Sequence, residues 1–187
     1  MSRWEPDARG RLERAAMELY IERGFEQTTV AEIAARAGLT ERTFFRHFAD
    51  KREVLFWGQG MLQELILGAM AKALESAPPI DAIAVALEAA GAALEERREG
   101  ARQRQAVIVA NPELQERELI KLATLSSAMA GVLRQRGVTE PAASLAAEAG
   151  IAVFRVAFER WVSASDGDLP HFIRESLDEL KAVTAVR

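Results

Sequence analysis

Apolar residues recur every three to four positions along most of the chain, which is the spacing of one face of an α-helix. The first such stripe is Leu12, Ala15, Ala16, Leu19 and Tyr20. Alanine, leucine, glutamate and arginine dominate, and runs of β-branched residues are short. The pattern predicts an all-α protein of about nine helices and contains no credible strand.

Capping residues divide this pattern into separate helices. A Thr or Asp cap binds free N–H groups at a helix start, and glycine is favoured just past a helix end. Thr29, followed three residues later by Glu32, has the form of a capping box. The fourth expected helix runs from Asp50 to about Glu75. The other expected boundaries are Asp7, Gly24, Gly38, Thr40, Asp81, Gly100, Asn111, Gly137, Thr139, Gly167 and Asp168.

Two short helices, over 30–38 and 41–48, are joined by a connection short enough to force a sharp turn. Gly38 supplies the backbone freedom that such a turn needs. On the second helix, Phe44 and Phe48 are one turn apart and share a face, which we expect to point inward. The opposite face of that helix is then exposed.

This outward face carries side chains suited to DNA. Arg46 points directly outward, with Arg42 and Thr43 on either side of it, and Phe45 and His47 lie on the flanks. Arginine can bind two acceptors of guanine in the major groove, and threonine can reach a base edge. The whole segment predicts a helix-turn-helix. An ordinary solvated face is the alternative, because arginine is frequent throughout this chain.

The charge pattern supports a local rather than a global nucleic-acid interface. The formal net charge is −4, which by itself weighs against nucleic-acid binding. Residues 36–52, however, hold five basic and two acidic side chains, a net charge of +3. The positive segment therefore coincides with the helix pair.

A dense, ordered motif runs through the same region. Its residues are Arg23-Gly24-Phe25, Thr28-Thr29-Val30-Ala31-Glu32-Ile33-Ala34, Ala37-Gly38-Leu39-Thr40, Thr43-Phe44-Phe45-Arg46-His47-Phe48 and Lys51. The motif resembles the N-terminal domain of the tetracycline-repressor (TetR) family of bacterial transcription regulators, over about residues 8–57. The resemblance implies a DNA-binding domain over residues 1–50, whose third helix reads DNA. It also implies a helical ligand-binding and dimerisation domain over 51–187.

The resemblance also implies which side chains meet double-stranded DNA. Thr29 and Lys51 fall at the family's usual phosphate-contacting positions. At position 45 the family commonly has tyrosine, whose hydroxyl can reach a phosphate, whereas Phe45 offers only an apolar contact. The complete set of expected DNA-binding residues is Thr29, Thr40, Arg42, Thr43, Phe45, Arg46, His47 and Lys51.

The helix expected over 141–162 is apolar on nearly every side, so it must be covered on more than one side. One face can pack on its own domain and the other on a second copy of the chain. A helix at the centre of a monomer is the alternative. Helix-turn-helix proteins read two half-sites as dimers, and the resemblance implies a four-helix dimer interface. The expected homodimer residues are Leu145, Ala149, Ala152, Val156 and Leu177.

An effector pocket is expected among the helices of the second domain. Its candidate lining residues, which could equally be ordinary core, are Leu65, Ile108, Leu122, Leu125, Met129, Phe154 and Phe158. The segment has some resemblance to family members with an acyl-CoA-like ligand-binding domain. The sequence thus points to a repressor released from a palindromic operator by a small apolar or acyl-type effector. A sequence-specific DNA-binding protein without a small-molecule effector is the alternative.

Gly58 and Gly60 lie inside the fourth expected helix, where each costs roughly 1 kcal/mol relative to alanine. Close packing of a neighbouring helix would explain them. The other interpretation is that they soften the connection between the effector-binding and DNA-reading domains.

Other classes of function find no support. The chain has no cysteine, which excludes disulfides and thiolate metal sites. It has no Walker loop, zinc-protease motif or nucleophile elbow, so no enzyme activity, metal or cofactor is expected; an enzyme or adaptor that merely retains the helix pair is a weak competitor. No apolar run approaches the roughly 20 residues of a membrane span, and the N-terminus lacks a signal-peptide core. We expect a cytoplasmic protein without membrane contact.

Overall fold

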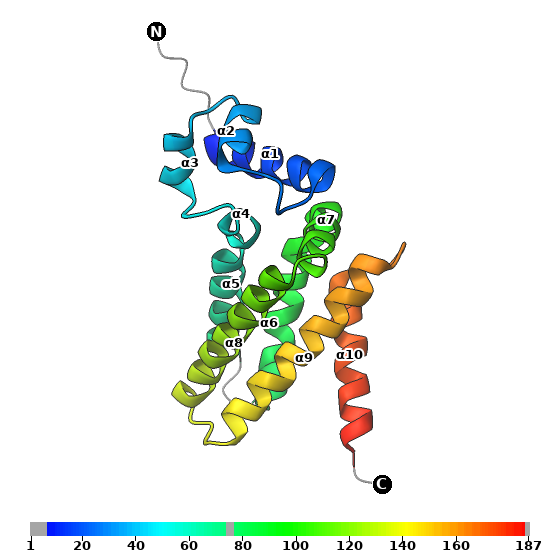
Figure 1. The fold of residues 1–187 in the computed structure, drawn as a ribbon. Helices are drawn as coiled ribbons and strands as arrows, with labels where there is room; N and C mark the ends of the chain where they lie inside the picture. Colours follow the sequence, from blue (N-terminus) through cyan, green and yellow to red (C-terminus); the bar gives the residue numbers. More distant parts are fainter. Residues whose placement is uncertain (1–6, 74–76, 186–187) are drawn as a thin grey trace. The chain divides into compact units, whose positions relative to one another are not determined.

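The computed structural model describes residues 7–73 and 77–185, and every regular element in these ranges is a helix (Figure 1). The prediction of an all-α protein is confirmed for this part of the chain. The helices are α1 (Ala8–Arg23), α2 (Val30–Arg36), α3 (Glu41–His47), α4 (Glu53–Phe56), α5 (Gln59–Lys72), α6 (Pro79–Leu94), the 3-10 turn η1 (Glu95–Arg97), α7 (Arg98–Val109), α8 (Pro112–Gln135), α9 (Ala142–Ser163) and α10 (Leu169–Thr184).

Asp7 and Asp168 cap helices as expected, whereas α6 begins at Pro79, before Asp81, and α9 begins at Ala142, after Thr139, both without a side-chain cap. At the start of α1, the Asp7 carboxylate accepts the backbone N–H of Gly10 at 2.9 Å. At the start of α10, the Asp168 carboxylate accepts the backbone N–H of His171 at 2.6 Å. Gly24 ends α1 with a φ of 86°, a conformation that L side chains rarely adopt. Short-range sequence signals therefore set these helix boundaries.

The single helix expected from Asp50 to about Glu75 is wrong. The chain turns at Gly58, which separates α4 from α5, although the Asp50 carboxylate does accept the backbone N–H of Glu53 at 2.9 Å. The expected end near Glu75 lies outside the described residues. Glycine lowers helix propensity by about 1 kcal/mol, and two glycines lie close together here, so the helix breaks.

Gly100 does not separate two helices as expected, because it lies inside the first turn of α7 and the interruption is at η1. Two arginines in the first turns of α7 donate to carbonyls at the end of α9. Arg98 Nη2 lies 2.7 Å from the Trp161 carbonyl oxygen, and Arg102 Nε lies 2.7 Å from that of Val162. These charge-assisted bonds hold the start of α7 and offset the cost of about 1 kcal/mol for the glycine.

The helices form two compact units. The first contains the described residues up to Gly58 together with Gln103–Glu118, and the second contains the described residues of Gln59–Arg102 and of the chain from Leu119 onward. The boundary expected after residue 50 thus differs from this division in two ways. α4 belongs with the helix-turn-helix, and a segment from the middle of the chain joins the same unit.

The core of the first unit is aromatic and aliphatic. Phe44 of α3 and Phe48, which directly follows this helix, are buried, as their inward placement predicted. α7 and α8 add Val107, Ile108 and Leu114, all buried in the same cluster. The segment 103–118 therefore completes the core beneath the helix-turn-helix.

In the second unit, α6 packs against α5, α9 and α10, and α9 lies beside α10 (Figure 1). Gly150 of α9 makes close approach possible, since a Cβ there would lie 2.5 Å from Cγ2 of Ile83 on α6. Trp161 of α9 is fully buried in this core. The second unit is thus a helical layer built around α6 and α9.

Candidate nucleic-acid interface

The turn between α2 and α3 is closed by backbone hydrogen bonds. The N–H of Leu39 reaches the carbonyl of Ala34 at 2.8 Å, and Gly38 adopts a φ of 65°. The Arg11 guanidinium of α1 donates to the Ala37 carbonyl, and a Cβ at Gly38 would meet this guanidinium at 2.8 Å. Glycine is therefore favoured at position 38 by the backbone conformation, while the contact with the guanidinium could be relieved by movement of the flexible Arg11 side chain.

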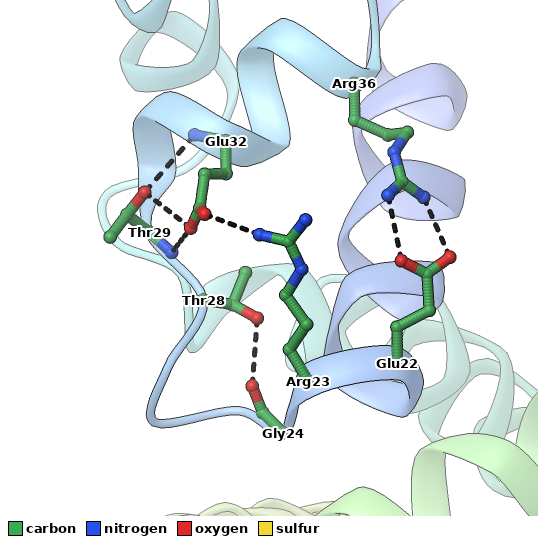
Figure 2. A network of polar contacts seen from close by, with 7 residues as sticks. All are labelled: Glu22, Arg23, Gly24, Thr28, Thr29, Glu32 and Arg36. Atoms are coloured by element: carbon green, nitrogen blue, oxygen red, sulfur yellow. Dashed lines mark hydrogen bonds and ion pairs between the residues drawn. The ribbon is translucent and has the colours of Figure 1, made fainter.

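The start of α2 is held by the predicted capping box, shown in Figure 2. The Glu32 carboxylate accepts the backbone N–H and the hydroxyl of Thr29, each at 2.9 Å. Arg23 of α1 binds the same carboxylate at 2.7 Å. The Thr29 backbone N–H, then its hydroxyl, and more weakly Arg23, lower the pKa of Glu32. Thr29 itself is exposed, so it remains available to a partner molecule.

α3 presents the expected face. Arg42, Phe45 and Arg46 are exposed, and Phe45 keeps 56% of its surface accessible. Thr40 caps the helix by accepting the backbone N–H of Thr43 at 3.2 Å, and the two hydroxyls lie 3.0 Å apart. The exposed surface of α3 thus combines two guanidinium groups, an aromatic ring and threonine hydroxyls.

Three of the five basic residues between 36 and 52 are bound to protein groups. Arg36 forms a bidentate pair with Glu22 of α1 at 2.8 and 3.0 Å, also visible in Figure 2. Arg52 binds Glu113 at 2.8 Å, and the Lys51 ammonium binds backbone carbonyls. Within the described chain, Arg42 and Arg46 form no such contact. The positive charge available to a partner is therefore concentrated on α3.

Lys51 lies in a setting that its sequence position did not indicate. Its Nζ donates to the carbonyls of Phe25, Glu26 and Thr28 at 2.8, 3.2 and 3.0 Å. It also lies 4.3 Å from the centre of the Phe25 ring. The Tyr20 hydroxyl donates to the Lys51 carbonyl at 2.6 Å, and burial, then the nearby carboxylate of Asp50, raises the pKa of this hydroxyl.

His47 is half-buried at the end of α3. Its Nε2 is buried and has no hydrogen-bond partner among the described residues. Burial is the main cause that lowers the pKa of His47, and the charges of Arg46 and Arg9 lower it further. These surroundings favour the neutral form of the imidazole, so His47 contributes less positive charge to the face of α3 than Arg42 and Arg46 do.

Sequence reasoning missed the polar contacts that fasten the segment 103–118 to α4. Arg104 Nε donates to the Leu55 carbonyl at 2.6 Å, and its Nη2 binds Glu118 at 2.7 Å. Arg117 pairs with Glu53. The Arg104 and Arg117 guanidinium groups lie 5.1 and 5.7 Å from the centre of the Phe56 ring. Arg104 and Leu55 are 49 positions apart in the sequence, and Arg117 and Glu53 are 64 positions apart. No local sequence pattern therefore indicates these contacts.

The candidate pocket residues do not share one environment. Ile108 belongs to the core of the first unit, whereas the other six lie in the second. Leu125, Met129 and Phe154 are buried there, and Leu65 is exposed. The set also omits a polar contact between α8 and α9, in which the buried Ser126 hydroxyl donates to Glu148 at 2.7 Å. The remaining two candidates, Leu122 and Phe158, are half-buried.

The candidate dimer residues also differ in their exposure to solvent. Leu145, Ala152 and Val156 are exposed on α9, and Ala149 between them is half-buried. Leu177 of α10 is buried in the core of its own unit. The four α9 positions therefore form an apolar stripe that reaches the surface, whereas Leu177 is not available to a partner chain.

The described residues show no sign of a metal site or of a membrane span. They contain no group of three or more His, Asp or Glu side chains placed to hold a metal ion. Among the helices in 7–73 and 77–185, none has both the length and the apolar character that crossing a membrane requires.

Known proteins share this arrangement. Residues 13–56 match the family model described as bacterial regulatory proteins of the tetR family, and residues 77–185 match the MftR C-terminal domain. The transcriptional regulator TcmR of Streptomyces glaucescens is 38% identical over 81 residues, which are 43% of this chain and 36% of TcmR. The chain thus spans about a third of the length of the curated relatives it matches.

Solved structures agree over nearly the whole chain. FadR of Thermus thermophilus, a TetR-family repressor solved with lauroyl-CoA, is 23% identical with a TM-score of 0.55, and the match covers 96% of both chains. FadR of Bacillus subtilis, solved with stearoyl-CoA, is 20% identical with a TM-score of 0.66, covering 95% of this chain and 99% of that one. At these identities the likeness concerns the fold.

Fold and site together define a helix-turn-helix protein with an appended helical domain. One family model covers the helix-turn-helix, and the other covers a separate stretch that makes up more than half of the chain. The chain belongs to the TetR family of bacterial regulatory proteins.

Proposed function

We propose that the protein is a dimeric transcriptional repressor that reads an operator with α3. The observation that carries this proposal is the face of α3, where Arg42 and Arg46 are exposed without a protein partner in the described chain and the exposed ring of Phe45 lies to one side of them. Arginine pairs with guanine in the major groove, and an aromatic edge can lie against a thymine methyl group. Thr29, Thr40 and Thr43 are the further candidate contacts, as hydrogen-bonding groups on either side of the turn.

A second copy of the chain is the proposed partner of α9. Leu145, Ala149, Ala152 and Val156 are spaced at i, i+4, i+7 and i+11, which places them on one helical face. Small alanine side chains let a second helix approach closely. Dimerisation would present two copies of α3 to the half-sites of a palindromic operator.

A small apolar or acyl-type molecule is the proposed effector. The buried residues Leu125, Met129 and Phe154 of α8 and α9 suit the hydrocarbon part of such a molecule. The FadR structures of T. thermophilus and B. subtilis were solved with acyl-CoA molecules, which supports testing this class first. An effector that binds only a conformation in which the α3 helices are misplaced stabilises that conformation. Operator affinity then falls by the difference between the effector's affinities for the two conformations.

The continuous helices α7 and α8 offer a route for this coupling. α7 begins in the second unit and ends in the first, and α8 runs in the opposite sense. Arg104 and Arg117, which bind α4, lie on these two helices. A shift of α8 on effector binding would therefore act on the contacts of α4, which follows α3 in the chain.

The test is fluorescence anisotropy with DNA flanking the protein's own gene, against a random-sequence duplex, at two salt concentrations. A preference of about 10³-fold or more, with a steep salt dependence, is expected of a specific regulator. Arg46→Ala should cost about 1–3 kcal/mol in specific binding. Arg36→Ala is the matched control, because it removes the same charge from the same segment but from a side chain bound to Glu22.

Two results would count against the proposal. If Arg42→Ala and Arg46→Ala both bind like the unaltered protein, α3 is not the reading helix. If specific binding exists but no acyl-CoA or other apolar metabolite releases it, the alternative of a DNA-binding protein without an effector is favoured.

A further inference from the structure

The Lys51 side chain connects the end of the helix-turn-helix to the loop at its start. The chain runs from the loop before α2, through α2, the turn and α3, to Lys51, which comes shortly after the end of α3. From there the ammonium returns to the starting loop, where it binds the carbonyls of Phe25, Glu26 and Thr28. The two ends of the helix pair are thus joined by a side chain.

The ammonium is fully used by these contacts. A lysine ammonium has three N–H donors and no acceptor, and three carbonyl oxygens lie within 3.2 Å of this one. The Phe25 ring lies 4.3 Å away, which adds a cation–π contact. A phosphate could bind Nζ only in exchange for one of these carbonyls.

Tyr20 of α1 also contacts Lys51 and the loop that Lys51 binds. The Tyr20 hydroxyl donates to the Lys51 carbonyl at 2.6 Å, and the Tyr20 ring meets the Phe25 ring edge-on at 5.1 Å. Thr28, which is buried, donates its hydroxyl to the Gly24 carbonyl at 2.9 Å, as Figure 2 shows. The contacts of Tyr20 and Thr28 therefore stabilise the same loop whose carbonyls Lys51 binds.

We propose that Lys51 is a positioning residue for DNA reading, which sets the orientation of α3 against α2 by clamping the α1–α2 loop, and is not itself a phosphate contact. This inference rests on the proposed function, because α3 must be the reading helix for its orientation to matter. Arginine cannot replace lysine in this role, because a planar guanidinium does not match three convergent carbonyls as a compact ammonium does.

The first test uses unaltered protein and its four lysines, Lys51, Lys72, Lys121 and Lys181. Acetylation with an N-hydroxysuccinimide ester is followed for each lysine by mass spectrometry, without and with a random-sequence duplex. Exposed Lys72 of α5 is the reference. Lys51 should react much more slowly than Lys72 without DNA. Equal rates without DNA, with protection of Lys51 by the duplex, would overturn the proposal.

The second test compares Lys51→Met and Lys51→Arg, with Lys72→Met as the matched control. Both Lys51 variants should lose about tenfold or more of the preference for a selected DNA fragment over the random duplex. Their salt slopes on the random duplex should stay unchanged, whereas loss of one phosphate contact lowers the slope by about 0.9. A flattened slope in Lys51→Met, with normal binding by Lys51→Arg, would overturn the proposal.

The two tests separate this proposal from the proposed function. Melting curves establish that each variant is folded at the binding temperature, and the acetylation test still decides if Lys51→Met does not fold. If the unaltered protein prefers no DNA fragment over the random duplex, the regulator function fails. The Lys51 reaction rate in the free protein then still reports whether the clamp exists.

Discussion

Gly150→Ala tests the packing of α9 against α6 and α8. A Cβ at position 150 would lie 2.5 Å from Cγ2 of Ile83 and 3.2 Å from Cε of Met129. The methionine end can move because its side chain has several rotatable bonds. The isoleucine cannot, because it is fully buried and a β-branched side chain in a helix has one strongly preferred rotamer. The added methyl group must therefore push the two helices apart.

The magnitude follows from two opposing effects. Alanine is favoured over glycine in a helix by about 1 kcal/mol. Overpacking a core costs typically 1–3 kcal/mol, and a 2.5 Å contact with a side chain that cannot turn belongs at about the upper limit. The expected net loss is about 2 kcal/mol, which lowers the Tm by about 4–8 °C for a chain of this size.

Thermal and urea unfolding of matched variants measure this loss. Gly68→Ala is the control, because a Cβ there meets nothing within 4 Å and the variant should gain up to about 1 kcal/mol. Adding Ile83→Ala to Gly150→Ala should cost less than the sum of the single changes, by about 0.5–3 kcal/mol. Equal or greater stability of Gly150→Ala, or strictly additive losses, would refute the packing argument.

Three further predictions concern regulation, assembly and pH. Replacing both Gly58 and Gly60 by alanine should preserve the fold and change effector-dependent release of DNA, measured by anisotropy; unchanged release would remove their role as a soft connection. Leu145→Glu should shift the protein toward monomer in analytical ultracentrifugation, because it places a charge on the apolar stripe of α9, and an unaltered dimer would place the interface elsewhere. The pKa of Glu32 is lowered first by the Thr29 backbone N–H, so its stabilisation is present above the ordinary value of 4.5 and is lost as pH falls through the folded value. Melting curves of Glu32→Gln and the unaltered protein should therefore converge in acid, and a constant difference down to about pH 3 would contradict this.

Local signals in the sequence predicted the helix boundaries where a side-chain cap forms, and failed at Gly58 and Gly100. The caps at Asp7, Thr29, Thr40 and Asp168 form because each acts on N–H groups two or three residues away. Close packing was the other explanation for Gly58 and Gly60, and it is wrong, because a Cβ at either position meets nothing within 4 Å. Gly150, which no local pattern singled out, is where close packing occurs.

Charge was the least predictable property of the candidate site. Arg36, Arg46 and Lys51 contribute equally to the net charge of the segment. Their surroundings differ, because Arg36 meets Glu22, Lys51 meets three carbonyls, and Arg46 meets no such group in the described chain. These partners come from α1 and the loop after it, so only the packed unit reveals which cations are available.

The discontinuous first unit limits how this protein can be recombined with its relatives. Val107, Ile108 and Leu114 complete a core whose other members come from the first 58 residues. A chimera joined at residue 58 would pair this N-terminal core with foreign residues at positions 107, 108 and 114. Transferring DNA specificity between family members therefore requires exchanging residues 103–118 together with the N-terminal segment. Both parts of the hydrophobic core then come from the same protein.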